Sequence, residues 1–212
     1  MKGDDRRESL AAARTVQEAS SFREPAGYLF WRNGEIYRCV RQAYSAQLEA
    51  TRASGLLEQC IRDGLLLPFE EGFAAPDGET DCCAVLKPQQ LEQISYPYEW
   101  SFEQLKDAAL LTLDLHLRGL EKDMGLKYAS AFNGQFIGAR PWFIDHLSFA
   151  ALDEYGMWPA YGQFCRHFLA PLALMSRIDP GLGRLLQVYL DGIPLPLAAK
   201  LLGRKSWLSP GL

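Results

Sequence analysis

Asn133 and Asp145 are two residues whose side chains could share a metal ion. Asn133 ends the mainly apolar stretch 126–133, and Asp145 follows the strand-like run 141–144, with a short polar turn between the two. Amide and carboxylate oxygens are ligands that Mg²⁺ accepts, and a metal held in this way can carry the phosphates of a nucleotide. The pair therefore predicts a magnesium–phosphate site. A second interpretation stays open, in which Asn133 caps a turn and Asp145 accepts hydrogen bonds from backbone amides without a metal.

The elements that must position this pair begin with a small sheet. Two β-prone runs, 27–31 and 35–40, bracket Asn33-Gly34, one of the strongest short signals for a tight hairpin. A helical stretch over 43–62 follows, and it is broken near Gly55.

Two further short strands complete the predicted sheet. Apolar runs at 65–69 and 82–87 lie on either side of an acidic loop that is rich in glycine and proline. We expect a flexible N-terminus over 1–20 and a sheet-containing lobe over 21–95.

A long helix follows the aromatic connector 95–100. Ser101 is a predicted N-cap, and acidic Glu103 stands in the first turn. Apolar residues recur at helical spacing through the segment, at positions 102, 105, 109, 113, 117, 120 and 124. Gly125 is predicted to end this helix.

The remainder is predicted to be mainly helical after a hairpin around 134–140 and the strand 142–144. Helical segments are expected over 161–176, 183–190 and 195–202, and Pro171 should kink the first of them. The helical lobe spans 96–212, so the predicted fold class is α+β with two lobes.

Composition excludes several classes of protein. The net charge of −4 argues against a nucleic-acid binder or an anionic-membrane binder, either of which needs clustered Lys and Arg. No apolar run approaches the ~18 residues that span a bilayer, and the charged N-terminus is unlike a secretory signal. The five cysteines show no CxxC spacing and are expected to be reduced thiols. We expect a cytoplasmic protein.

The order of these elements, with the Asn133 and Asp145 stretch at its centre, resembles the protein-kinase-like fold, in particular its aminoglycoside-phosphotransferase branch. The resemblance implies that Asn133 and Asp145 are metal ligands and that position 128 should hold an orienting aspartate. Position 128 is Tyr128. A phenol, whose pKa is near ~10, is a poor base at neutral pH.

The same resemblance implies ATP with Mg²⁺ as cofactors, and three residues are candidates to contact the nucleotide. Arg38 and Lys87 are the available cations for the phosphates, and Glu99 lies in the aromatic connector. The Asn33-Gly34 turn is too tight to cover a triphosphate as a glycine-rich loop does.

A narrower resemblance covers residues 22 to 205. It rests on five strings: SYPYEW at 95–100, QLKDAAL at 104–110, ASAFN at 129–133, FIDHLSF at 143–149 and QFCRHFLAPLAL at 163–174. These resemble a bacterial group, including a nodulation host-specificity protein, that is identified with class I S-adenosylmethionine-dependent methyltransferases. In that group the methyltransferase domain follows this region, and the present sequence contains no glycine-rich methyl-donor loop.

Two functional hypotheses follow. The first is a catalytically degraded, kinase-like accessory module that binds a small-molecule or protein substrate or a methyltransferase partner, with S-adenosylmethionine bound only by that partner or by a missing C-terminal domain. The second is an atypical Mg²⁺-dependent small-molecule phosphotransferase that uses Asn133 and Asp145.

Overall fold

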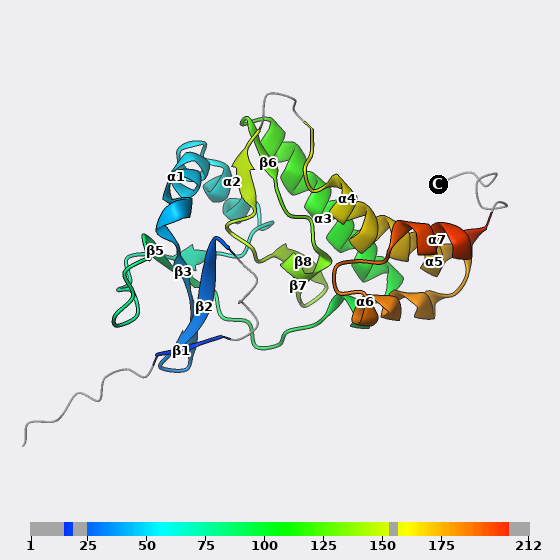
Figure 1. Cartoon of the computed structure of the whole chain (residues 1–212), viewed down its shortest axis with the longest axis horizontal. Coiled ribbons are helices and arrows are strands. Elements are labelled where there is room, and N and C mark those ends of the chain that lie inside the picture. The colour runs from blue at the N-terminus through cyan, green and yellow to red at the C-terminus, as the bar shows by residue number, and fades with distance from the viewer. Residues whose placement is uncertain (1–14, 19–24, 153–156, 204–212) are drawn as a thin grey trace, which may run out of the picture. The chain divides into compact units, whose positions relative to one another are not determined.

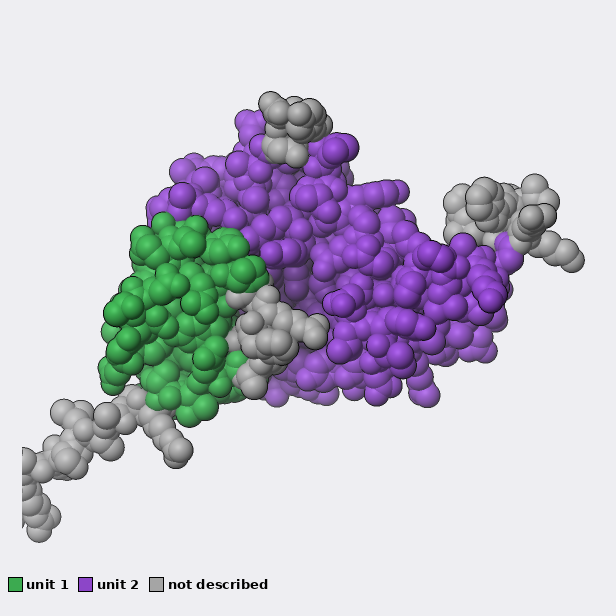
Figure 2. Space-filling view, viewed as in Figure 1, with its two compact units in different colours: residues 1–45, 69–90 green, residues 46–68, 91–212 purple. Residues whose placement is uncertain are grey.

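The computed structural model describes residues 15–18, 25–152 and 157–203, and it divides into two compact units of mixed α and β structure (Figures 1 and 2). The first unit comprises residues 1–45 and 69–90, and the second comprises 46–68 and 91–212. Residues 46–68, which we expected in the sheet-containing lobe, therefore cluster with the helical unit. Most of the predicted flexible segment 1–20 lies outside the described residues.

The first unit is built on a five-stranded antiparallel sheet in the order β1-β2-β3-β5-β4. Its strands are β1 (Thr15–Gln17), β2 (Gly27–Arg32), β3 (Glu35–Val40), β4 (Phe69–Glu70) and β5 (Ala84–Pro88). Asn33 and Gly34 both have positive φ, 54° and 80°, as a type I′ hairpin turn requires. The predicted hairpin is confirmed. The predicted strand over 65–69 is mostly wrong, since only Phe69 of it enters this sheet.

One face of this sheet forms the core of the first unit. Five buried side chains pack together on this face: Tyr28, Phe30, Tyr37, Cys39 and Val85. Because side chains alternate between the faces of a strand, the register places neighbouring residues on the opposite face.

Helices α1 (Ser45–Ala53) and α2 (Leu56–Arg62) follow a 3₁₀ turn, η2 (Gln42–Tyr44), and the second unit begins at Ala46. Gly55 separates the two helices with φ of 68°, a conformation that glycine adopts without a steric penalty. The predicted break is confirmed.

Helix α3 (Phe102–Leu120) is capped as predicted: the Ser101 hydroxyl accepts a hydrogen bond from Gln104 N, and the Gln104 side chain accepts one from Ser101 N. The expected apolar stripe is partly wrong, because Leu117 is 59% exposed. The helix instead buries a broad face that includes small and polar residues, since it packs against β6 and β8 on one side and α5 on another. The helix also ends at Leu120, before the predicted Gly125, and Asp123 turns the chain with φ of 55°.

Two small antiparallel pairs follow α3. The first joins β6 (Met124–Leu126) to β9 (Phe149–Ala151), and the second joins β7 (Gly134–Ile137) to β8 (Arg140–Phe143). A 3₁₀ turn, η4 (Ala131–Asn133), leads into β7. The predicted hairpin around 134–140 is confirmed.

The chain then forms α4 (Tyr161–Phe164), a π-helical turn η5 (Cys165–Leu169), α5 (Ala170–Arg177), η6 (Pro180–Arg184), α6 (Leu185–Val188) and α7 (Leu195–Leu202). Pro171 has no N–H for the carbonyl of His167, and the turn widens so that Ala170 N donates to the carbonyl of Cys165. The carbonyl of Arg166 accepts instead from Ile193 N, at 2.9 Å. The predicted interruption at Pro171 is thus confirmed as a π-turn.

None of the helices in the described ranges combines the length and the apolar character that crossing a bilayer requires. All five cysteines carry free thiols; three are buried, whereas Cys82 and Cys83 are half-buried.

Candidate functional site

Asn133 and Asp145 lie in one hydrogen-bonded network whose centre is Ser148. The Ser148 hydroxyl donates a short hydrogen bond to Asp145 Oδ2, and Asn133 Nδ2 donates to Ser148 Oγ at 3.3 Å. Asp145 Oδ1 accepts from Leu147 N at 3.2 Å. The two loops are also joined through the backbone, since Ile144 N donates to the carbonyl of Asn133 at 2.8 Å. The predicted pair is therefore brought together, but through a serine that the sequence reasoning did not select.

The loop 145–148 is buried and fixed from several sides. Asp145 is 7% exposed and Ser148 is 0% exposed. His146 Nε2 lies 2.7 Å from the carbonyl of Leu67, and Lys127 N donates to the carbonyl of Ser148 at 2.8 Å.

A side chain from α1 holds the same loop. Gln47 Nε2 donates to the carbonyls of Leu147 and Phe149, at 3.1 and 2.7 Å, and Gln47 Oε1 accepts from Lys127 Nζ at 3.3 Å. Together with the strand β9 that begins at Phe149, these contacts determine the position of the Asp145 carboxylate.

Asn133, Asp145 and Ser148 form a buried network of hydrogen bonds. Both carboxylate oxygens of Asp145 accept hydrogen bonds from residues of the same loop. The interpretation without a metal expects hydrogen bonds of this kind. Across the described residues, no three His, Cys, Asp or Glu side chains lie close enough to hold a metal together. The metal-binding role of Asn133 and Asp145 stays a prediction.

Tyr128 is half-buried near this network. Lys127 Nζ lies 5.0 Å from the centroid of the Tyr128 ring, within cation–π range. The ring thus contacts a cation, and the position supplies no carboxylate.

Arg38 and Lys87 are not brought together by the first unit. Arg38 pairs with Leu86 across β3 and β5, so Lys87, the next residue on β5, projects from the opposite face. Lys87 Nζ forms an ion pair with Glu35 at 2.9 Å, and this hydrogen bond raises the pKa of Lys87. The two cations therefore do not form a joint phosphate grip.

Glu99 lies in the connector, in a short 3₁₀ turn, η3 (Pro97–Glu99). Its Oε2 accepts from Tyr96 N at 2.7 Å, so part of its function is to cap this turn. The connector is fixed to β7, because Gln135 exchanges two hydrogen bonds with the backbone of Ser95, at 3.0 and 2.9 Å. Trp100 anchors the connector's other end, with its indole N–H donating to Ser95 Oγ at 2.9 Å. These contacts hold the connector against β7.

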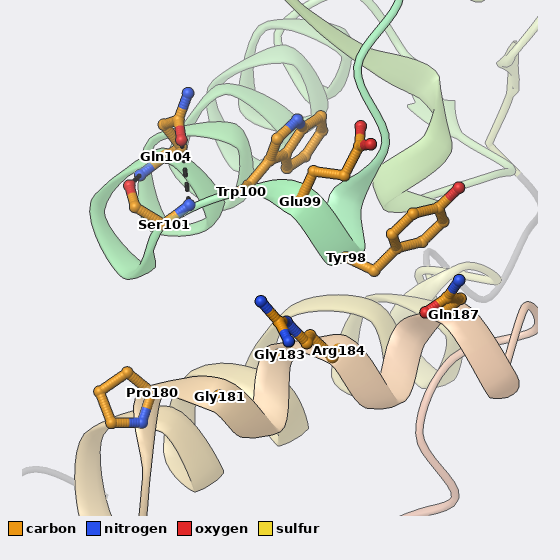
Figure 3. Close-up of a pocket in the computed structure, with 10 residues that line it drawn as sticks. All are labelled: Tyr98, Glu99, Trp100, Ser101, Gln104, Pro180, Gly181, Gly183, Arg184 and Gln187. Carbon is orange, nitrogen blue, oxygen red and sulfur yellow. Dashed lines mark hydrogen bonds between the residues drawn. The ribbon is translucent and has the colours of Figure 1, made fainter.

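Glu99 also lines a cavity of about 700 Å³ between the connector and η6 with α6 (Figure 3). Its lining residues all belong to the second unit: Tyr98, Glu99, Trp100, Ser101, Gln104, Pro180, Gly181, Gly183, Arg184 and Gln187. The sequence reasoning missed this cavity. One sequence signal could have indicated it: Arg184 and Gln187 are three residues apart, a spacing that places both side chains on one side of a helical turn.

His116 and His167 are two buried histidines of the second unit. His116 stacks on Trp158 at 4.2 Å, and its Nδ1 accepts from Leu126 N at 3.3 Å. His167 is 1% exposed, its Nδ1 has no hydrogen-bond partner in the described part of the chain, and burial lowers its pKa to about 4. The His167 ring is therefore neutral at pH 7, and burial also lowers the pKa of His116.

Comparison with known proteins gives one informative similarity. No protein-family model matches the chain. The chain is 38% identical, over 201 residues, to the nodulation protein NoeA of Rhizobium meliloti (strain 1021). The match covers 94% of this chain and 42% of NoeA, so the chain spans less than half the length of that relative. The similarity supports the expected relationship to a nodulation protein.

Proposed function

We propose that this chain is a catalytically degraded, kinase-like accessory module that binds a substrate or partner for S-adenosylmethionine-dependent methyl transfer. The observation that carries the proposal is the inward-turned Asp145: its carboxylate, which a phosphotransferase would offer to a metal, accepts hydrogen bonds from Leu147 N and Ser148 Oγ in its own loop. Hydrogen bonding of this kind is the usual state of buried polar groups in folded proteins.

Other positions of the kinase-like pattern support the same reading. Tyr128 replaces the orienting aspartate, and Lys87 is paired with Glu35 inside the sheet-containing unit. The Asn33-Gly34 turn adopts the tight I′ conformation, which leaves no loop to cover phosphates.

The relative supports the association with a larger activity. More than half of NoeA lies outside the match, and in the methyltransferase group that this chain resembles, the methyl-donor domain follows the equivalent region. We therefore expect the module to work with such a domain, in the cytoplasm, and in a process related to nodulation.

Mixing two purified proteins tests this proposal. The first is this chain, and the second is the part of NoeA outside the match, produced separately; size-exclusion chromatography and calorimetry then report binding. We expect the two proteins to form a complex. An excess of the NoeA region that matches this chain should displace this chain from the complex, because the two regions are 38% identical. S-adenosylmethionine should bind the NoeA part and give no heat with this chain alone. Absence of a complex at about 50 μM of each protein, a concentration at which micromolar binding saturates, would reject the partner-binding proposal.

The alternative proposal is an atypical Mg²⁺-dependent phosphotransferase, and the observation that favours it is the convergence of Asn133 and Asp145 on Ser148. Thermal unfolding with millimolar ATP and Mg²⁺ separates the two proposals. A nucleotide at 100 times its dissociation constant stabilises a fold by about 2.7 kcal/mol. A metal-dependent shift that Asp145→Asn abolishes would support the phosphotransferase, and an unchanged melting temperature would reject it.

A further inference from the structure

The cavity between the connector and η6 with α6 has the size and lining of a small-molecule site. Its volume of about 700 Å³ lies within the range of ligand pockets, which is roughly 300–1,000 Å³. Trp100, which is 5% exposed, forms part of its wall, and the connector that carries this residue is fixed to β7 by the Gln135 hydrogen bonds. Packing and hydrogen bonds thus fix the connector side of the cavity.

Arg184 gives this cavity a positive charge that is not neutralised within it. Figure 3 shows its guanidinium directed from the lower helix toward the connector, whereas the Glu99 carboxylate points to the other side of the connector. Glu99 Oε2 is engaged with Tyr96 N, and Arg184 forms no ion pair with any acidic group in the described ranges. A guanidinium presents five N–H donors in a planar fork that suits carboxylate or phosphate oxygens.

The remaining polar groups suit hydroxyls. Gln187 supplies a side-chain amide, and the Tyr98 ring adds an aromatic wall beside it (Figure 3). Gln104 also lines the cavity, but its Oε1 accepts from Ser101 N at 3.0 Å and its side chain lies on the side of the connector away from α6 (Figure 3). Amide donors and acceptors around an aromatic ring bind the hydroxyls and the apolar face of a sugar-like ring.

Two glycines, Gly181 and Gly183, line the lower side of the cavity. A Cβ at Gly183 would lie 2.9 Å from Met175 Sδ, and one at Gly181 would lie 2.8 Å from Asp179 Oδ1. Glycine at these positions therefore allows close packing against Met175 and Asp179, which lie outside the cavity lining.

We propose that this cavity binds a small hydroxyl-bearing anion, of the class of phosphorylated sugars, with Arg184 holding the phosphate and Gln187 contacting hydroxyls beside the Tyr98 ring. The site is formed within the second unit alone. It is independent of the proposed partner binding, and either proposal can fail without the other.

Titration of the full chain with glucose 6-phosphate, glucose and inorganic phosphate, followed by calorimetry and by NMR, tests the proposal. We expect glucose 6-phosphate to bind more tightly than either of the other two probes. Arg184→Gln should weaken its binding about tenfold or more, because hydrogen bonds to a charged group are being lost. The charge-matched control Lys200→Gln changes an exposed residue on α7 that does not line the cavity, and it should leave binding unchanged.

Three results would overturn the proposal. The first is no binding of glucose 6-phosphate at 10 mM, a concentration at which even roughly millimolar affinity is visible. The second is equal binding by wild type and Arg184→Gln when both remain folded by circular dichroism. The third is equal affinity for inorganic phosphate and glucose 6-phosphate, which would remove the role of the hydroxyl contacts. A selective loss of the preference for glucose 6-phosphate over phosphate in Gln187→Leu would support the assignment.

Discussion

Replacing Ser148 by alanine should destabilise the second unit strongly, although the change removes a single oxygen. Ser148 is fully buried, and its hydroxyl donates to the Asp145 carboxylate while accepting from Asn133 Nδ2. A hydrogen bond to a charged group contributes ≈ 1.5–3 kcal/mol and a neutral one ≈ 0.5–1.5 kcal/mol. The hydrogen bond from Asn133 is long, at 3.3 Å, so its contribution should lie at the lower end of the range for a neutral hydrogen bond. The expected loss in the free energy of unfolding is about 2–4 kcal/mol.

Urea unfolding followed by tryptophan fluorescence measures this loss. Trp100, Trp142 and Trp158 all lie in the second unit, so the signal mainly reports the unfolding of that unit. The control is Ser176→Ala, which changes an exposed serine on α5 and should cost less than about 1 kcal/mol.

Equal destabilisation by Ser148→Ala and Ser176→Ala would refute the reasoning, because the network would then contribute nothing to the fold. Asp145→Asn gives an independent check. If the carboxylate serves the network, this variant should be destabilised to the same extent with and without Mg²⁺. Destabilisation that appears only when Mg²⁺ is present would instead indicate a metal site and contradict the structural role that we assign.

Two further predictions concern buried positions. Burial lowers the pKa of His167 in the folded chain to about 4, from its ordinary 6.5. Between pH 6.5 and 4 the unfolded chain therefore binds more protons than the folded chain, so the free energy of unfolding falls as the pH falls through this range. The free energy of unfolding should fall by about 2 kcal/mol from pH 7 to 5, at ≈ 1.36 kcal/mol for each pH unit, and urea unfolding measures this loss. A His167→Gln variant that keeps the full pH dependence would contradict the prediction. Gly192→Ala should cost about 2–4 kcal/mol, since φ is +87° and the new Cβ would lie 2.5 Å from Arg166 Cβ. Gly138→Ala, at φ of +61° with open space around it, should cost only about 1 kcal/mol in the same assay.

Local signals in the sequence predicted the elements that depend on local chemistry. Asn33-Gly34 specified a hairpin because both residues tolerate positive φ, and Ser101 marked the start of α3 because its hydroxyl satisfies a free N–H. The exposure of Leu117 could not be predicted from such local signals. Apolar spacing identifies a helix face, but which face is buried depends on the elements that pack there, and α3 is contacted by β6, β8 and α5.

The candidate site was predictable only in part for the same reason. Asn133 and Asp145 were recognised by type and spacing, whereas the role of Ser148 depends on β9 returning beside β6 and bringing the loop back to Asn133. The cavity around Arg184 combines a connector with a helical turn more than 80 residues later, and no local pattern joins them.

The π-turn at Cys165–Leu169 has a consequence for comparing this chain with its relatives. A turn that closes from residue i to i+5 holds one more residue than an α-helical turn, so everything after it is rotated by roughly 100° relative to an uninterrupted helix. A relative without a proline at the position of Pro171 can form a regular helix with one residue fewer. Its alignment should then carry a single-residue gap inside 165–169, and a gapless alignment would assign the wrong residues to the buried face on one side of the turn.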